Sequence, residues 1–141
     1  MRLLASTDIA LRVLILLTRE PPGRPVSVDA LARTLGELSR HHLHKIVQEL
    51  AALGVVRTVR GAAGGVLLDQ PPETVRLGAL IARLEADQAL VECFRTDGGD
   101  CTLTPDCRLK LMLRDARDGF YRSLDAHTLA DCVPAAPAIP A

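Results

Sequence analysis

The segment from Ser27 to Leu68 most constrains the fold of this chain of 141 residues. Ser27 is a good N-cap for a short helix, and Gly36 stands where a C-terminal glycine belongs. Ser39 can cap a second helix, whose apolar residues recur with an α-helical period: Leu43, Ile46, Val47, Leu50 and Leu53. Two helices joined by a tight turn with glycine predict a helix-turn-helix.

A predicted β-hairpin follows this helix pair. A valine-rich stretch over 55–59 and a short apolar stretch over 66–68 flank a glycine-rich loop over 60–65. This order is typical of the wing of a winged helix, and the alternative is a generic hairpin beside a helical pair. With an apolar helix expected over about 7–19, we predict a mainly α fold with a small β-hairpin, a winged helix-turn-helix over residues 1–72.

Residues 73–131 predict a further helix over about 75–85, an irregular stretch and a long C-terminal helix. Thr104 is the expected cap of the long helix, and Pro105 suits its first position. Residues 132–141 are rich in proline and alanine, so we expect them to form a disordered tail.

The long helix carries an apolar stripe that consists of Leu109, Leu113, Ala116, Phe120 and Leu124. No folded segment is expected after this helix to cover the stripe. We therefore expect it to pack against the same helix of a second subunit around a two-fold axis, which makes the protein a homodimer. The alternative is that the helix packs back on its own winged helix.

The formal net charge of zero hides an asymmetry between the two halves of the chain. Residues 1–68 hold nine basic and five acidic residues, a balance of +4. Residues 69–141 hold eight basic and twelve acidic residues, a balance of −4. The basic half is therefore the candidate for contact with an anion such as double-stranded DNA.

Composition narrows the class of protein. Apolar residues make up 48% of the chain, enough for a hydrophobic core, and no apolar run approaches the roughly 20 residues of a membrane span. The charged Asp8 and Arg12 interrupt the apolar N-terminus, which argues against a signal peptide, so we expect a cytoplasmic protein. No carboxylate pair and no nucleophile paired with a base is recognisable, so we do not expect an enzyme.

The second helix of the predicted helix-turn-helix carries the candidate DNA contacts. They gather in its first turns, where such a helix meets base edges and phosphates: Ser39, Arg40, His41, His42, His44 and Lys45. Arg60, at the base of the wing, suits a narrow minor groove or a phosphate. The alternatives are a solvated helix face, and a zinc site built from the three histidines, which do not share one face well.

Three cysteines lie within fifteen residues: Cys93, Cys101 and Cys107. Disulfides are disfavoured in the cytosol, so this spacing indicates metal or redox chemistry. Cys107 falls in the first turn of the predicted long helix, where the dipole favours thiolate. The spacing is wider than in zinc knuckles, and an iron–sulfur cluster fits better. Cys132 lies at the expected tail and is a poor candidate; the alternative for the trio is scattered buried cysteines.

These features together resemble the Rrf2 family of transcription regulators over about residues 1–131. The resemblance rests on residues 38–47 (LSRHHLHKIV) and on the wing over 59–65 (VRGAAGG). Residues 90–94 (LVECF), 101–110 (CTLTPDCRLK) and 125–131 (DAHTLAD) look most like the nitric-oxide-sensing branch of that family.

The resemblance implies a homodimeric repressor that holds one [4Fe-4S] cluster per subunit and releases its DNA operator when nitric oxide reacts with the cluster. The matching ligands are Cys93, Cys101 and Cys107. In that branch the fourth ligand can be an aspartate near the N-terminus of the other subunit, and Asp8 stands at the matching place. From the sequence alone, Asp8 can also be a first-turn charge that stabilises the helix dipole.

Two alternatives stay open. A [2Fe-2S] regulator of the same family uses a histidine three residues after the last cysteine, where this chain has Lys110. A zinc-stabilised DNA-binding protein would be colourless. Compared with the family that the chain resembles, the loop between Cys93 and Cys101 is longer than is typical.

Overall fold

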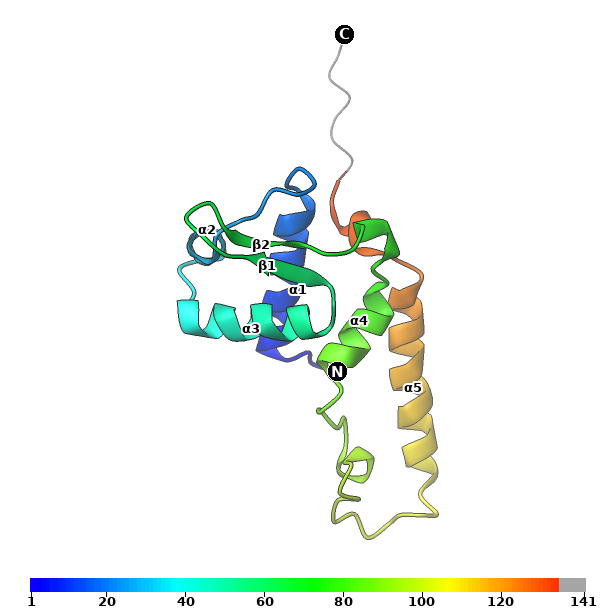
Figure 1. Ribbon diagram of the computed structural model, residues 1–141. Coiled ribbons are helices and arrows are strands. Elements are labelled where there is room, and N and C mark those ends of the chain that lie inside the picture. The colour runs from blue at the N-terminus through cyan, green and yellow to red at the C-terminus, as the bar shows by residue number, and fades with distance from the viewer. Residues whose placement is uncertain (135–141) are drawn as a thin grey trace. The chain divides into compact units, whose positions relative to one another are not determined.

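The computed structural model describes residues 1–134. Its α-helices are α1 (Ala5–Thr18), α2 (Val28–Thr34), α3 (Arg40–Ala52), α4 (Leu77–Leu84) and α5 (Arg108–Asp125), and its strands are β1 (Val56–Val59) and β2 (Gly65–Leu68) (Figure 1). Short 3-10 helices are η1 (Pro72–Thr74), η2 (Glu92–Phe94) and η3 (Leu129–Cys132). This element order confirms the predicted fold class. None of the helices in the described part of the chain is long and apolar enough to cross a membrane.

The chain divides into two compact units. The winged-helix unit comprises residues 8–75 and 128–134, and the cysteine-loop unit comprises residues 1–7 and 76–127. The break at 75 lies close to the expected one at 72. Long-range hydrogen bonds explain why the ends of the chain are grouped differently from the prediction. The amide of Leu129 donates to the carbonyl of Val75, whereas the amide of Leu4 donates to a carboxylate oxygen of Glu85.

The helix pair of the winged-helix unit has the predicted caps. The Ser27 hydroxyl accepts a hydrogen bond from the amide of Ala30 at 3.1 Å, and the Ser39 hydroxyl accepts one from His42 at 3.4 Å. Gly36 has a φ of +91°, a left-handed conformation that suits glycine in the turn. Along α3 the predicted apolar positions Leu43, Ile46, Val47 and Leu50 are all buried, and the predicted helix-turn-helix geometry is therefore present.

The hairpin has the predicted wing, together with one contact that sequence reasoning missed. β1 and β2 pair antiparallel, with Val56 opposite Leu68. Val26, in the loop before α2, exchanges both backbone hydrogen bonds with Val66 and so adds a bridge to the edge of β2. A Cβ at Gly65 would lie 2.3 Å from the carbonyl oxygen of Val26. This glycine is thus required by packing inside the protein.

The chain after α5 is ordered further than expected. Leu129 is fully buried, and η3 continues to Cys132, whose Sγ lies 3.9 Å from the carbonyl oxygen of Thr128. Residue 132 therefore ends a helical turn and does not begin a tail. Residues 135–141 of the expected disordered tail lie outside the described residues.

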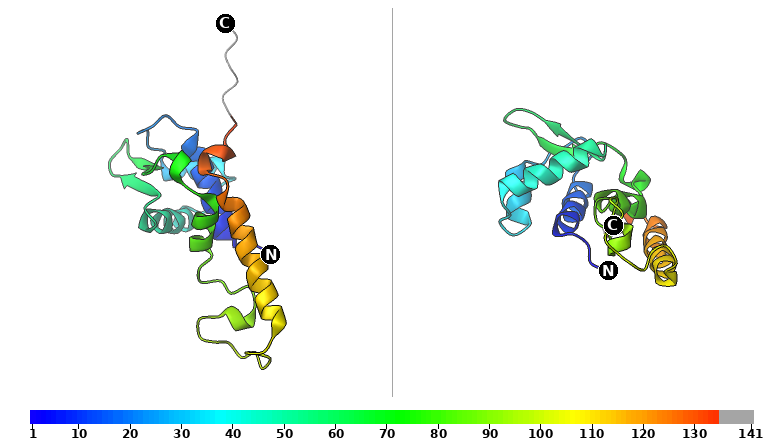
Figure 2. Two further views of the ribbon diagram at one scale, coloured as in Figure 1. Left: turned by 90° about the vertical axis from the view of Figure 1, so that its right-hand side faces the viewer. Right: turned by 90° about the horizontal axis from the view of Figure 1, so that it is seen from below.

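In the cysteine-loop unit, α4 packs closely against the C-terminal part of α5 (Figures 1 and 2). A Cβ at Gly78 would lie 2.0 Å from the carbonyl oxygen of Tyr121, so only glycine permits this approach. Asp125 Oδ1 accepts a hydrogen bond from the amide of Ala79 at 2.9 Å, and the carbonyl of His127 accepts one from Leu77. The end of α5 thereby satisfies amides at the start of α4 that no side chain of α4 itself caps.

The long helix begins at Arg108, and the predicted start near Thr104 is wrong. Cys107 is the N-cap residue with extended backbone, at φ −74° and ψ 110°, and the residues before it form turns. A proline at position 105 disfavours helical backbone at Thr104, the residue before it. Pro105 therefore does not open the helix, and Cys107 lies at its cap, outside the first turn.

The predicted stripe of α5 is only partly covered within its unit. No residue of α5 is fully buried: Leu109 is 58% exposed, Ala116 is exposed, and Leu113, Phe120 and Leu124 are half-buried. Met112, which adjoins the stripe, is 61% exposed. The contacts of α4 are made on another side of the helix, at Tyr121 and Asp125. The stripe is thus an apolar surface that remains available for a partner.

We predict that Asp125→Ala lowers the free energy of unfolding by about 1 kcal/mol, because the substitution removes the side chain that caps α4. Asp115→Ala is the matched control, since Asp115 makes only an exposed 3.9 Å ion pair with Arg114 and should change stability little. Urea unfolding of both variants at one protein concentration measures the difference. Equal stability of the two variants would show that the Asp125 contact does not hold the helix pair.

Candidate DNA interface and metal-binding loop

The second helix of the helix-turn-helix, α3, presents a polar face to solvent. His41, His42, His44 and Lys45 are exposed, whereas the opposite face of the helix is buried. At helical spacing, His41, Lys45 and Gln48 lie along one side of the exposed face. Side chains on this side of a recognition helix are those that reach base edges in a major groove.

Arg40, one of the predicted DNA contacts, is held by a neighbouring helix. Its Nε lies 2.8 Å from Oδ1 of Asp29 on α2. This ion pair links the two helices of the helix-turn-helix across their turn. Sequence reasoning missed Asp29 because nothing in the spacing of the two residues shows that the turn brings them together.

Other cations near the hairpin and α3 differ in whether they have a carboxylate partner. Arg57 pairs with Asp69 across the hairpin at 3.3 Å, and Arg24 pairs with Glu20 at 3.6 Å. Lys45 on α3 and Arg60 at the start of the wing are exposed and form no ion pair within residues 1–134. These two side chains can therefore contact phosphates or bases without first losing a carboxylate partner.

The three cysteines flank the turns that lead into α5. Cys93 lies in η2, Cys101 follows a glycine-rich turn, and Cys107 caps α5; all three thiols are free and half-buried. Within residues 1–134 of one chain, no three His, Cys, Asp or Glu side chains are close enough together to hold a metal ion. The structure thus places the three thiols in one loop but does not bring their sulfur atoms together. The three histidines of α3 do not form a metal site either.

The surroundings of Cys101 suit a thiolate. The amide of Leu103, then the hydroxyl and amide of Thr104, are directed to its sulfur and lower the pKa of the thiol. The Thr104 hydroxyl is buried and has no hydrogen-bond partner of normal geometry in the described part of the chain. By contrast, burial and then the charge of Asp131 raise the pKa of Cys132. Three half-buried thiols with donors aimed at one of them are a donor set that fits an iron–sulfur cluster.

Asp8 lies in the first turn of α1 and is exposed. Its carboxylate accepts from Arg12, with Oδ2 2.7 Å from Nη2 and Oδ1 3.3 Å from Nε. An exposed ion pair between residues four apart contributes only about 0.3–0.5 kcal/mol. Replacement of Arg12 by a stronger partner therefore costs little free energy, and the carboxylate of Asp8 can serve as a ligand.

Sequence reasoning missed a polar network between Cys93 and Cys101. Arg95 Nε donates to Asp97 Oδ1 at 3.0 Å, Arg95 Nη2 pairs with the other oxygen of Asp97, and Nη1 lies 3.3 Å from Glu92 Oε1. The guanidinium of Arg95, followed by the amide of Gly99, holds the pKa of Asp97 below its ordinary value. The only signal in the sequence is the alternation of charges around a pair of glycines, which many loops share.

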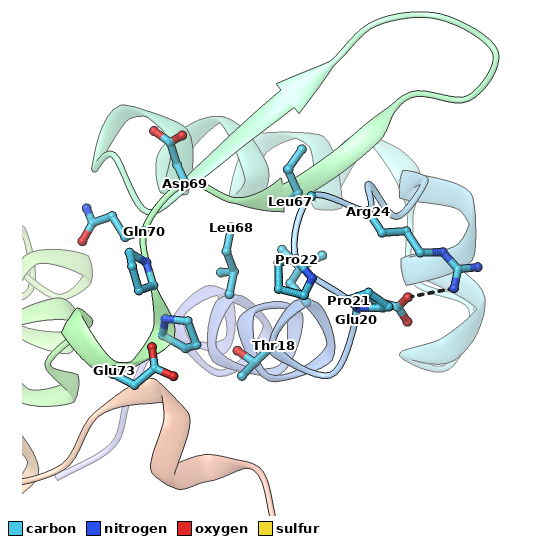
Figure 3. Close-up of a pocket in the computed structure, with 14 residues that line it drawn as sticks. Thr18, Glu20, Pro21, Pro22, Arg24, Leu67, Leu68, Asp69, Gln70 and Glu73 are labelled. Carbon is cyan, nitrogen blue, oxygen red and sulfur yellow. Dashed lines mark ion pairs between the residues drawn. The ribbon is translucent and has the colours of Figure 1, made fainter. Parts of the chain in front are cut away.

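A separate cavity of about 570 Å³ lies in the winged-helix unit, where the loop after α1 meets the end of β2 (Figure 3). Prolines 21, 22, 71 and 72 and the side chains of Leu67 and Leu68 line it. The Glu20–Arg24 ion pair lies at its edge. None of the predicted DNA-binding or cysteine residues lines this cavity, so the candidate sites are elsewhere.

Comparison with known proteins agrees with this geometry. Residues 3–135 match the Rrf2 family, described as an iron-dependent transcriptional regulator. The HTH-type transcriptional regulator NsrR of Geobacillus kaustophilus is 42% identical over 131 residues, which are 93% of this chain and 88% of that protein. NsrR of Bacillus subtilis is 38% identical over 133 residues, 94% of this chain and 90% of that protein.

Solved structures of regulators have the same fold. CymR, the global cysteine regulator of B. subtilis, superposes with a TM-score of 0.72 at 27% identity and covers 95% of this chain and 99% of its own. IscR of T. potens superposes with a TM-score of 0.70 at 25% identity and covers 94% and 85% of the two chains. Because the family match spans nearly the whole chain and the relatives agree with it along their length, this protein belongs to the Rrf2 family of transcriptional regulators and is not an enzyme.

Proposed function

We propose that the protein is a cytoplasmic, homodimeric repressor that binds a double-stranded DNA operator and holds one [4Fe-4S] cluster per subunit, with nitric oxide as the signal that releases it from DNA. The observation that carries this proposal is the set of three free thiols in one loop of a winged-helix regulator. The similarity to regulators named NsrR, and in fold to IscR, supports it.

The DNA-binding part of the proposal rests on α3 and the wing. Ser39, Arg40, His41, His42, His44 and Lys45 face the major groove, and Arg60 contacts the adjacent minor groove or backbone. The exposed pair of Arg40 with Asp29 also links α2 and α3. The two recognition helices of a dimer then read two half-sites related by its symmetry.

The metal-binding part rests on Cys93, Cys101 and Cys107 with Asp8 of the partner subunit. When bound, the cluster supplies iron that reacts with nitric oxide. A carboxylate is a harder ligand than thiolate and would bind cluster iron more weakly, so Asp8 would be the ligand that is released most easily. Arg12 pairs with this carboxylate in the metal-free chain. Without Asp8 as a ligand, the cysteine loop of one subunit would no longer be linked to the first helix of the other, and the affinity for DNA would fall.

We expect Lys45→Ala and Arg60→Ala each to weaken DNA binding by about 1–3 kcal/mol, because each removes an unpaired cation from the proposed interface. Arg24→Ala is the matched control, since Arg24 is an exposed arginine of the same unit that pairs with Glu20. The measurement is fluorescence anisotropy at one salt concentration, with a DNA fragment selected by the wild-type protein. Wild-type affinity in both variants would place the interface elsewhere.

A charged residue introduced into the apolar stripe of α5 should convert dimers into monomers. Leu113→Asp and Phe120→Asp each bury an unpaired carboxylate in the proposed two-fold interface, which is costly. Leu111→Asp is the control, since Leu111 is 51% exposed and lies on the other side of the helix. Light scattering with sedimentation velocity measures the mass. If both stripe variants remain dimeric, the stripe packs within its own subunit.

The cluster assignment is tested by anaerobic purification, followed by iron analysis and visible spectroscopy. Cys93→Ala, Cys101→Ala and Cys107→Ala should each abolish the brown chromophore, while Cys132→Ala should keep it. Asp8→Ala should keep a cluster with an altered spectrum and an altered response to nitric oxide. In the wild type, addition of nitric oxide should bleach the chromophore and release the bound DNA.

Other results contradict particular parts of the proposal. Zinc without iron in anaerobic wild-type protein rejects the cluster. Two irons per subunit favour the [2Fe-2S] alternative. A chromophore lost in Cys132→Ala, with a normal spectrum in Asp8→Ala, shows that the fourth ligand is misassigned.

A further inference from the structure

The loop between the first two cysteines is closed by its own polar contacts. Seven residues separate Cys93 from Cys101, and after η2 they form turns and bends without further helix or strand. A segment of this kind loses conformational entropy when its ends are brought together. The contacts among Arg95, Asp97 and Glu92 offset part of this entropy cost, because they hold the ends of the loop together.

These contacts join the residues that directly precede the two cysteines. Glu92 Oε1 accepts a hydrogen bond from the amide of Asp100 at 3.2 Å, and the same oxygen pairs with Arg95. Asp97 Oδ1 accepts from the amide of Gly99 at 3.0 Å and from Arg95. One guanidinium thus ties together two carboxylates, and these carboxylates hold the backbone immediately before Cys101.

Gly99 permits the close approach on which this closure depends. It has a φ of +56°, and a Cβ at this position would lie 2.3 Å from the carbonyl oxygen of Glu92. The two ends of the loop are therefore in contact through backbone as well as through side chains. Side chains other than hydrogen would push Asp100 away from Glu92.

A second contact attaches the loop to α5. The guanidinium carbon of Arg117 lies 5.0 Å from the centre of the Phe94 ring, a cation–π distance. Phe94 follows Cys93, and α5 begins directly after Cys107. These contacts thus restrain the loop that carries Cys93 and Cys101 and attach its start to α5.

We propose that Arg95, acting through Asp97 and Glu92, is a positioning residue that keeps the two ends of the Cys93–Cys101 loop close together, so that less ordering remains when a cluster binds, and that it slows the loss of that cluster. This inference rests on the proposed function for the identity of the bound group. Arg95 is not itself a ligand of the cluster. Its effect comes from ordering the loop before the cluster binds. Arginine suits this position because its planar fork pairs with both oxygens of Asp97 and also reaches Glu92, whereas the ammonium of lysine is a point charge without this fork.

The first experiment measures hydrogen exchange in the metal-free protein. Arg95→Ala should speed exchange at the amides of Gly99 and Asp100, because both donate to carboxylates that Arg95 holds in place. Arg114→Ala is the matched control, with a similarly exposed side chain that makes only a 3.9 Å pair with its neighbour. Unchanged protection in Arg95→Ala would overturn the proposal, since the loop would be ordered without Arg95.

The second experiment measures cluster loss. After anaerobic reconstitution with iron and sulfide, an iron chelator is added and the decay of visible absorbance and circular dichroism is followed. Arg95→Ala should lose its cluster roughly tenfold faster than wild type, and Arg95→Lys should not restore the wild-type rate. Asp97→Ala should give a similar defect, and the double variant should be no worse than either single one.

The outcomes separate this inference from the proposed function. If the wild type loads no iron, the proposed function fails together with the part of the inference that concerns the cluster. If the wild type loads a cluster and Arg95→Ala keeps it as long as Arg114→Ala does, the inference alone is wrong. Equal melting temperatures of the metal-free variants would show that any faster loss comes from the loop and not from general instability.

Discussion

The close packing of α4 on α5 determines where the rest of the cysteine-loop unit can lie. Gly78 lets the two backbones approach, and Asp125 caps the shorter helix. α4 has eight residues and α5 has eighteen, so α4 reaches along less than half of its neighbour. The segment from the end of α4 to Cys107 must therefore extend along the remaining part of α5. The same mismatch in length leaves Leu109 and Met112 exposed near the start of α5.

In the winged-helix unit, pairing divides the positive charges into two kinds. Arg40 and Arg57 have carboxylate partners and hold helices or strands together. Lys45 and Arg60 are exposed and form no ion pair among the described residues, so they can meet an anion without first breaking an internal contact. DNA affinity comes largely from phosphate contacts. We therefore expect the unpaired cations Lys45 and Arg60 to matter more for DNA binding than the net charge of the chain, which is zero.

The helix caps, the buried face of α3 and the hairpin could be predicted, because each depends on residues close together in the chain. The start of α5 could not. Thr104, Pro105 and Asp106 form a good local helix start, but in the folded chain they lie in turns, and the helix begins four residues later, at Arg108. The Val26 bridge and the Arg40–Asp29 pair were missed for a similar reason, since both join segments that only the folded chain brings together.

The sequence by itself determined the family, the winged helix and the residue types of the candidate DNA interface and cysteine loop. Periodicity, capping residues and cysteine spacing all depend on residues that are near one another in the chain. Only the tertiary structure decided which cations are already paired, where α5 begins and how the Cys93–Cys101 loop closes. Arg95 shows the difference: its charge is evident in the sequence, but its contacts depend on Glu92, Asp97 and the backbone at Gly99 meeting in space. Such meetings arise from turn geometry and close packing, which a one-dimensional pattern does not specify.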